Sequence, residues 1–393
     1  MPDEHNVKIV FSTGIRYTKP KWALKARVVK RGDDMESSIR NGYGNRRRYR
    51  KTAAVFLMAL LLAGCQKGER ELTEVEIGME AVGKGDYKGA LASFEAEIAG
   101  EGDLLRAYRG AGMAYMGMGE YEQAVQLFDA ALHETDEKQE ENRKDILYYK
   151  AAALYRQQDY DGTIGVCREI LDIAQEGDAL YLTGTCYLEK GDEEAAQMNF
   201  DLAVQAAPKD YDIYLNIYES YKEKKQSAKG AEYLQQALQV ESGKQEDAYY
   251  KARIYYNLEN YEEAGAQLTG LLEEKNGDAL LLMGKIYLAV EDPARSAKMY
   301  EQYLAEIGES PEAYNGIVLA KMAQQDYDAA LAAVAKGLAL DTEQGKQSLL
   351  YNEIVAYEHK GEFTAAKVKA EIYMEKYPAD EAGRKEYEFL LNR

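Results

Sequence analysis

Histidines, cysteines and a glycine-rich segment are the parts of this 393-residue chain that could carry catalysis, metal binding or phosphate binding. The histidines, His5, His133 and His359, lie far apart, and none stands at the spacing of a metal site or a catalytic triad. Segment 78–85 spells most of a phosphate-binding loop, but Gly85 stands where a Ser or Thr would have to bind Mg²⁺. We therefore expect no enzyme, no metal and no cofactor.

Cys65 is the exception, because the residues before it indicate a chemical modification. A basic segment, 46–51, precedes an apolar run, 53–62, and small residues stand at 63–64. This order is typical of a secretory signal, and the run is too short to cross a bilayer as a helix, which needs about 20 residues. The ending Leu-Ala-Gly-Cys at 62–65 resembles the bacterial lipobox. The resemblance implies cleavage before Cys65 after a diacylglycerol is attached to its sulfur; the alternative is an ordinary secretory signal that contains a cysteine.

A leader of residues 1–64 is longer than such signals usually are. Residues 1–34 fit no part of a signal, and Met35 would give a leader of ordinary length, so we expect translation to start there. Residues 65–71 would form a tether of at most about 25 Å. Because two lipid chains give stable attachment where one does not, lipidation predicts a protein anchored on the extracytoplasmic face of a bacterial cell membrane.

Most of the remaining chain, 72–378, is built on a repeat with a modal step of 34 residues. Each unit shows helical periodicity interrupted by a turn, and most have small residues twelve positions apart, such as Gly112 and Ala124, where two helices would touch. A helical hairpin of this size cannot bury its apolar face alone, so the units must stack. The residue that follows the turn gives the register, at Tyr87, Tyr121, Tyr160, Glu193, Ser227, Tyr261, Pro293, Tyr327 and Phe363.

This pattern resembles the tetratricopeptide repeat family over 307 of the 393 residues. Two units depart from it, because Ala81 and Lys321 stand where the first helix should carry a large apolar residue. The resemblance implies an all-α fold, a right-handed α-solenoid of about nine helix-turn-helix repeats whose concave groove is lined by the first helix of each unit. The amphipathic end of the chain, 379–393, is expected to form a C-terminal capping helix.

The groove is the expected binding surface. The chain has 33 Tyr against 7 Phe and 1 Trp, and Tyr and Arg are favoured at binding hot spots. The alternative is that these tyrosines are merely exposed or pack on neighbouring repeats. An Hsp90-type carboxylate clamp, which the family uses in chaperone binding, is not expected, because no unit has Asn one residue past its helix contact. The residues expected to face the groove are Tyr148, Tyr155, Arg156, Tyr181, Tyr249, Arg253, Tyr256 and Tyr351.

The net charge of −19 is unevenly distributed along the chain. Residues 1–64 hold 14 basic and 5 acidic side chains, so the remainder holds 35 basic and 63 acidic ones, a net charge of −28. So acidic a body repels nucleic acid and anionic lipid headgroups. We expect a basic or neutral partner and no nucleic acid.

Cys167 and Cys186 are predicted on neighbouring helices of adjacent repeats and could lie near each other. Three cysteines are too few for a disulfide framework. Two small buried apolar side chains are therefore favoured over a disulfide, and the sequence leaves their pairing open.

The leading functional hypothesis is a membrane-anchored scaffold that binds a protein or peptide at the bacterial cell envelope. A chaperone-like accessory to secretion or cell-wall assembly is a variant that the same features fit. A glycan- or solute-binding surface lipoprotein is the alternative, since aromatic grooves also stack on sugars.

Overall fold

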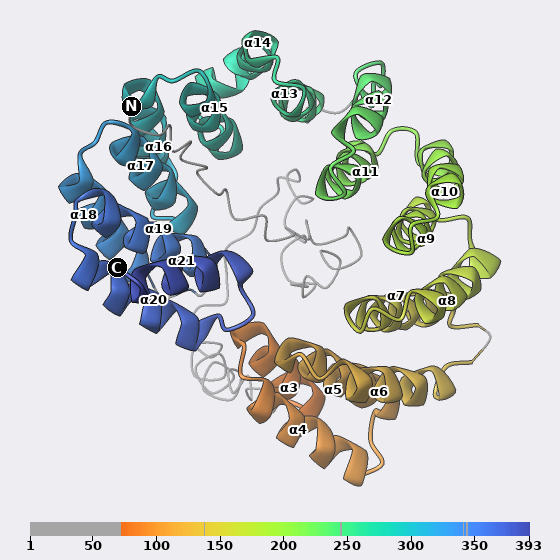
Figure 1. The fold of residues 1–393 in the computed structure, drawn as a ribbon. Coiled ribbons are helices and arrows are strands. Elements are labelled where there is room, and N and C mark those ends of the chain that lie inside the picture. The colour runs from red at the N-terminus through yellow and green to blue at the C-terminus, as the bar shows by residue number, and fades with distance from the viewer. Residues whose placement is uncertain (1–71, 137, 244–245, 341, 343–344) are drawn as a thin grey trace, which may run out of the picture. The chain divides into compact units, whose positions relative to one another are not determined.

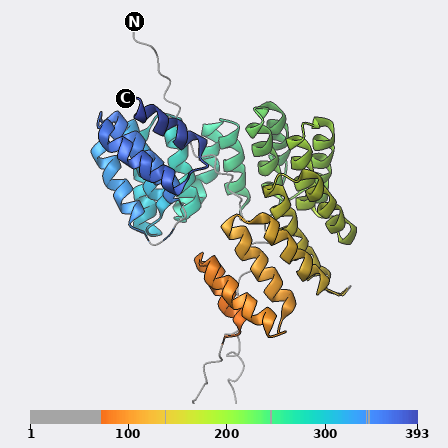
Figure 2. The same cartoon turned by 60° about the horizontal axis from the view of Figure 1, so that its bottom comes forward.

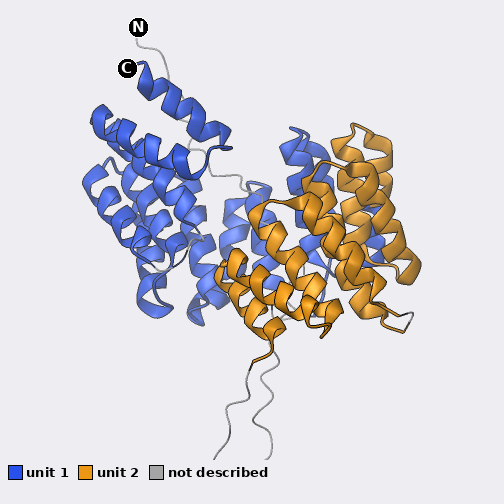
Figure 3. Ribbon diagram, turned by 90° about the horizontal axis from the view of Figure 1, so that it is seen from below, with its two compact units in different colours: residues 1–14, 200–393 blue, residues 15–199 orange. Residues whose placement is uncertain are grey.

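A computed structural model describes residues 72–393 except 137, 244–245, 341 and 343–344 (Figure 1). The predicted leader, tether and Cys65 lie outside the described residues. Within the described ranges every regular element is an α-helix, which confirms the all-α prediction. None of these helices has the length and apolar content needed to span a membrane. The helices form two compact units, which we number in chain order. The first unit has the described part 72–199 (orange, unit 2 in Figure 3), and the second unit is 200–393 (blue, unit 1 in Figure 3).

In the unit that ends at Asn199, the helices come in pairs, and each helix packs on the next along the chain. They are α3 (Glu74–Lys84), α4 (Tyr87–Ala99), α5 (Leu104–Met118), α6 (Tyr121–His133), α7 (Glu140–Arg156), α8 (Tyr160–Ile173) and α9 (Gly177–Glu189). Helix α10 (Glu193–Ala206) crosses from this unit into the other.

The unit that begins at Phe200 continues with the same helical pairs and ends with a single helix. Its helices are α11 (Tyr211–Glu223), α12 (Ser227–Ala237), α13 (Asp247–Asn257), α14 (Tyr261–Glu273), α15 (Gly277–Ala289), α16 (Pro293–Glu306), α17 (Pro311–Ala323), α18 (Tyr327–Leu338), α19 (Lys346–His359), α20 (Phe363–Lys376) and α21 (Glu381–Leu391).

The repeat register predicted from the sequence is confirmed, because the second helix of every unit begins at the predicted residue. Two positions before that residue, the backbone adopts the left-handed conformation in all nine units. The left-handed residue directs the backbone N–H of the following residue back to a carbonyl of the first helix. In the seventh repeat, Glu291 is left-handed and Asp292 N donates to Tyr287 O at 2.8 Å. Asp292 then caps α16 by accepting from Arg295 N at 3.0 Å.

Only four of the nine left-handed turn residues are glycine, the residue that adopts this conformation without steric cost. The glycines are Gly85, Gly119, Gly191 and Gly361, and the others are Gln158, Lys225, Glu259, Glu291 and Gln325. In the other five turns the left-handed residue has a Cβ atom, which this backbone conformation brings too close to the following carbonyl oxygen.

Glycines where the helices touch leave space for aromatic rings from the second helix of a unit. A Cβ atom at Gly112 would lie 2.5 Å from Cε1 of Phe128, whose ring is fully buried. Carbon atoms in contact are normally about 3.5–4.0 Å apart, so a larger residue does not fit there without displacing the ring. The ring takes the place of a side chain on the facing helix, which lets the two helices approach closely.

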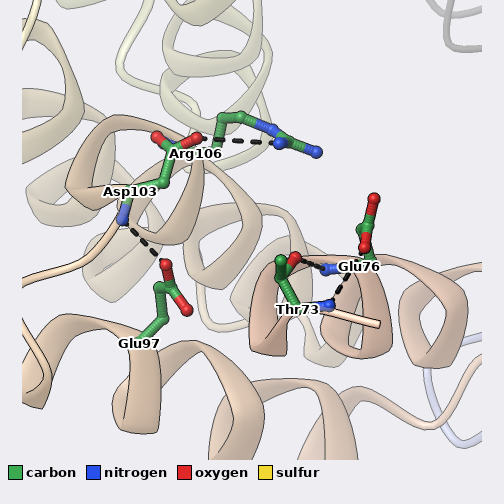
Figure 4. Close-up of polar contacts among 5 residues, drawn as sticks. All are labelled: Thr73, Glu76, Glu97, Asp103 and Arg106. Atoms are coloured by element: carbon green, nitrogen blue, oxygen red, sulfur yellow. Dashed lines mark hydrogen bonds and ion pairs between the residues drawn. The ribbon is translucent and has the colours of Figure 1, made fainter. Parts of the chain in front are cut away.

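The first repeat begins with a capping box (Figure 4). Thr73 Oγ1 accepts from Glu76 N at 3.2 Å, and Thr73 N donates to Glu76 Oε2 at 3.0 Å. The start of α5 is held from α4, because Asp103 N donates to Glu97 Oε1 at 2.8 Å. Arg106 pairs with the Asp103 carboxylate at 3.6 Å, so the ends of α3 and α5 are both fixed by polar contacts.

The last helix, α21, lies against α20, as both views show (Figure 1 and Figure 2). Asp380 caps it by accepting from Gly383 N at 3.2 Å, and Leu390 is buried with Ile354 and Tyr373. The Tyr373 hydroxyl donates to Asp380 at 2.5 Å and accepts from Gln347 of α19 at 3.0 Å. Helix α21 thus covers the apolar side of the last pair, as a cap of a repeat array must.

Candidate protein-binding surface

The predicted groove residues of the first unit do not form one exposed surface. Tyr148 is 7% exposed and packs in the core with Cys167 and Ile170. Tyr155 is half-buried against Tyr160, with ring centroids 5.7 Å apart. Arg156 is exposed, and its Nε donates to the Tyr121 hydroxyl at 3.2 Å.

Burial sets the chemistry of Tyr148, because it raises the pKa of this phenol far above its usual range. The hydroxyl therefore stays protonated, and the ring offers no face to solvent. Tyr181 of α9 is half-buried. Of the predicted residues in this unit, Tyr155, Arg156 and Tyr181 are the ones that keep solvent exposure.

In the second unit, three predicted residues lie on one helix, α13. Tyr249, Arg253 and Tyr256 follow the spacing i, i+4, i+7, which places them on one face. All three are partly exposed. Tyr256 packs against Tyr261, with ring centroids 5.7 Å apart and planes at 59°. This face of α13 is the largest grouping of partly exposed predicted residues on one helix.

Arg253 is held by a set of residues that we call the Arg253 cluster: Asp212, Tyr249, Tyr250 and Arg253. Its guanidinium lies 3.4 Å from Asp212 Oδ1, and its Cζ is 5.8 and 5.5 Å from the ring centroids of Tyr249 and Tyr250. The Tyr250 hydroxyl donates to Asp212 Oδ2 at 2.9 Å. Because the cation is paired and stacked, Arg253 presents a fixed planar group and not a freely rotating charge.

The first unit holds a related set, the Arg109 cluster, made of Arg109 on α5 and of Asp145 and Tyr149 on α7. Arg109 Nε donates to Asp145 Oδ2 at 2.5 Å, and its Cζ lies 5.0 Å from the Tyr149 ring centroid. The Tyr149 ring stacks on buried Phe128, with centroids 5.7 Å apart. An acid, an arginine and a tyrosine thus join successive first helices in both units.

Sequence reasoning missed the acids Asp145 and Asp212 and the tyrosines Tyr149 and Tyr250. Asp145 and Asp212 stand six residues before the helix contacts of their units, and Tyr149 and Tyr250 stand two before theirs. An acid also holds the first of these positions at Asp178, Glu246, Asp278 and Glu312. This recurrence was a readable signal, but acids in the first turn of a helix are common because they complement its dipole.

Tyr351 lies beneath the C-terminal helix. Its hydroxyl donates to Glu386 Oε2 of α21 at 3.5 Å, and its ring meets Tyr373 edge-on at 5.9 Å. Burial, followed by the charge of Glu386, raises the pKa of Tyr351 to about 12. This residue contributes to holding α21 in place.

The remaining reactive groups form no site in the described part of the chain. Cys167 and Cys186 are both buried free thiols. Burial raises the pKa of the Cys167 thiol to about 12, so it carries no nucleophilic thiolate at neutral pH. Across 72–393, apart from the residues left undescribed, no three His, Cys, Asp or Glu side chains are grouped to hold a metal ion.

Comparison with known families identifies the repeat. A model of the tetratricopeptide repeat matches residues 75–138, 109–178 and 281–344, and a second model of the same description matches 177–210. Together these matches cover about half of the chain, in both compact units. A search of the curated proteins found no match.

Several solved structures are similar at low identity. The crystal structure of MamA is 20% identical, with 45% of this chain and 97% of that chain covered and a TM-score of 0.36. A tetratricopeptide repeat protein from Parabacteroides merdae is 14% identical, with 65% and 99% covered and a TM-score of 0.42. The Cut9–Hcn1 hetero-tetramer of APC/C is 13% identical, with 81% and 83% covered and a TM-score of 0.38. None of these scores reaches 0.5, and the assignment rests on the repeat models.

Proposed function

Because this chain belongs to the tetratricopeptide repeat family, whose members are generally non-enzymatic scaffolds for protein–protein interaction, we propose that it is a lipid-anchored scaffold for a protein or peptide partner at a bacterial cell envelope. The first part of this proposal is anchoring through Cys65 on the extracytoplasmic face of the membrane. The second part is binding through the first helices of the repeats. The two halves rest on different residues and are tested separately.

Anchoring is supported by the residue order at 62–65, Leu-Ala-Gly-Cys, after a short apolar run and a basic segment. Cells that express the full chain would be labelled with a fatty-acid precursor, and the purified protein would be examined for label. We expect label in the wild-type chain and in Cys167→Ser, and none in Cys65→Ser. Label that survives Cys65→Ser would exclude the lipid anchor at this residue.

Binding is supported by one observation above the others, the face of α13 that presents Tyr249, Arg253 and Tyr256 together. Tyrosine supplies large contact area with a polar tip and little rotamer entropy, and arginine adds a planar donor group. The side chains from 200 to 393 include 34 acidic and 22 basic ones, so this unit carries a net charge of −12. The surface is therefore suited to a partner segment that is neutral or basic and has groups to stack on the tyrosines.

The binding half would be tested with a photo-crosslinking residue placed at Tyr256 in the native cell, followed by measurement of affinity for the crosslinked protein. We expect Tyr249→Ala and Arg253→Ala to weaken that affinity by about tenfold or more each, as hot-spot residues do. Arg295→Ala is the matched control, because Arg295 is also ion-paired (Asp292, 2.5 Å) and stacked on a tyrosine (Tyr287, 4.6 Å), but belongs to a second helix. Equal affinities of all three variants and the wild type would show that α13 is not the binding surface.

A further inference from the structure

Two carboxyl groups share the interface where the C-terminal helix meets the last repeat. Glu358 lies on α19, two turns after Tyr351, whose hydroxyl donates to Glu386 of α21 at 3.5 Å. Because positions i and i+7 lie on one face of a helix, both carboxyls are at this contact. Glu358 is half-buried, and its Oε1 is inaccessible to solvent and has no hydrogen-bond partner. Two ionised carboxylates can only accept hydrogen bonds, so neither can satisfy the other.

The surrounding charges do not neutralise this pair. Arg393 has the smallest influence on the pKa of Glu358, which it lowers, and its guanidinium lies over the rings of Phe363 and Phe389, with Cζ 3.9 and 5.4 Å from their centroids. The Tyr351 hydroxyl donates to Glu386 at the long distance of 3.5 Å. No described residue forms an ion pair with either carboxylate.

Nearby ionisable groups on α18, α19 and α20 are engaged elsewhere. Lys360 pairs with Asp328 of α18 at 2.7 Å and with Glu362, the residue before α20, at 2.9 Å. The His359 ring stacks on Tyr327 with centroids 5.7 Å apart. The cation nearest to Glu358 in sequence is therefore already paired with two other carboxylates.

Protonation of one carboxyl would remove the repulsion between the two groups. If one carboxyl is protonated, it donates to the other, and the two oxygens that would repel each other share a hydrogen bond. In agreement, the pKa of Glu358 is raised well above its ordinary value of 4.5, first by burial and then by Glu386. When α21 is undocked, both carboxyls are hydrated, and the pair no longer binds a proton more tightly than ordinary carboxyl groups do.

We propose that α21 is a pH-dependent latch that docks on α19 and α20 with a proton shared between Glu358 and Glu386 and loosens when both carboxyls ionise. The sign follows from linkage, since the docked state binds the proton more tightly than the undocked state. Docking is unpenalised below the ordinary carboxyl pKa and weakens as the pH rises through the raised one. Undocking exposes the Tyr351 and Tyr373 rings that α21 covers.

Hydrogen exchange on the full chain tests the latch. Protection of the α21 amides, corrected for intrinsic exchange rates, would be compared at about pH 5 and about pH 8.5, with α17 (Pro311–Ala323) as the internal reference. We expect the protection of α21 to fall by about tenfold or more at the higher pH, and the protection of α17 to change less. Equal protection of α21 at both pH values would overturn the proposal.

Variants assign the effect to the pair. Glu358→Gln supplies an N–H donor to Glu386 at every pH, so its α21 protection should be nearly independent of pH. Glu371→Gln, an exposed carboxyl on α20, is the matched control and should keep the wild-type pH dependence. Should Glu358→Gln fail to fold, Glu386→Gln provides the same test from α21. A wild-type pH response in the soluble Gln variant would overturn the assignment.

Discussion

Tyr300 occupies the space that a side chain at Gly316 would need: a Cβ atom there would lie 2.3 Å from Cζ of the ring. The ring is buried at 2% exposure and also fills the space above Gly284, in its own repeat. One aromatic residue of α16 therefore sets how closely α15 and α17 approach it. The same relation joins Phe94 to Gly78 and Gly110 in the other unit.

Gly316→Ala is expected to destabilise the second unit by about 1–3 kcal/mol, because the buried ring must move to admit the new methyl group. Urea unfolding followed by circular dichroism would measure the loss. Gly270→Ala is the control, since a Cβ atom there meets nothing within 4 Å and alanine favours helix. A loss at Gly270 as large as that at Gly316 would show that the ring contact is not the cause.

Glu259→Gly is expected to stabilise the chain by about 0.5–1 kcal/mol. Glycine removes the steric cost of the left-handed conformation, and this gain exceeds the loss that comes from the greater entropy of the unfolded chain. The φ angle of Glu259 is 58°. Gly119→Ala, at the equivalent turn with φ 79°, should destabilise by about 1 kcal/mol. Glu262→Gly, in the first turn of α14, is the matched control and should destabilise. Unfolding midpoints of the three variants compare these signs directly.

Tyr373→Phe should destabilise the docking of α21 by about 1.5–3 kcal/mol, the range for a hydrogen bond to a charged group. The lost hydroxyl bonds both Asp380 and Gln347, so it ties the start of α21 to α19. Amide protection across 381–391 reports the change. Tyr303→Phe, whose hydroxyl takes part in no hydrogen bond within the described ranges, is the control and should leave α21 protected.

Cys167 and Cys186 should resist alkylation in the folded chain at about pH 8 and react only after unfolding, because burial both raises the thiol pKa and blocks the reagent. Mass spectrometry after iodoacetamide treatment, with and without urea, would count the modified thiols. A slow rate equal to the rate of global unfolding would confirm that access requires opening. Rapid labelling of the folded chain would contradict the buried placement.

The repeat register could be read from the sequence because it depends on local spacing. The residue after each turn, from Tyr87 to Phe363, was placed correctly at the start of every second helix. The exposure of the predicted groove residues could not be read as well, because it depends on how successive repeats are packed. Tyr148 shares its position with Tyr249, yet it is buried beside Cys167, while Tyr249 stays partly exposed.

The pairing of Arg253 with Asp212 could not be predicted from the sequence for the same reason. The two residues are 41 positions apart and meet only because one first helix follows another in the stack. The contact of Glu358 with Glu386 likewise requires the path of the chain after α20. The spacing within one repeat is encoded locally, whereas the side-chain partners between neighbouring repeats depend on the angle between their helices.

The four turns that hold a non-glycine left-handed residue in the second unit are consecutive, at Lys225, Glu259, Glu291 and Gln325. In a stack where each repeat contacts only its neighbours, stability is close to a sum of local contributions, and the weakest run opens first. The helices from α11 to α18 should therefore open cooperatively before the glycine-turned repeats of the first unit. A mechanical pull on the chain would be absorbed there, which would make this segment an extensible spring between two firmer ends.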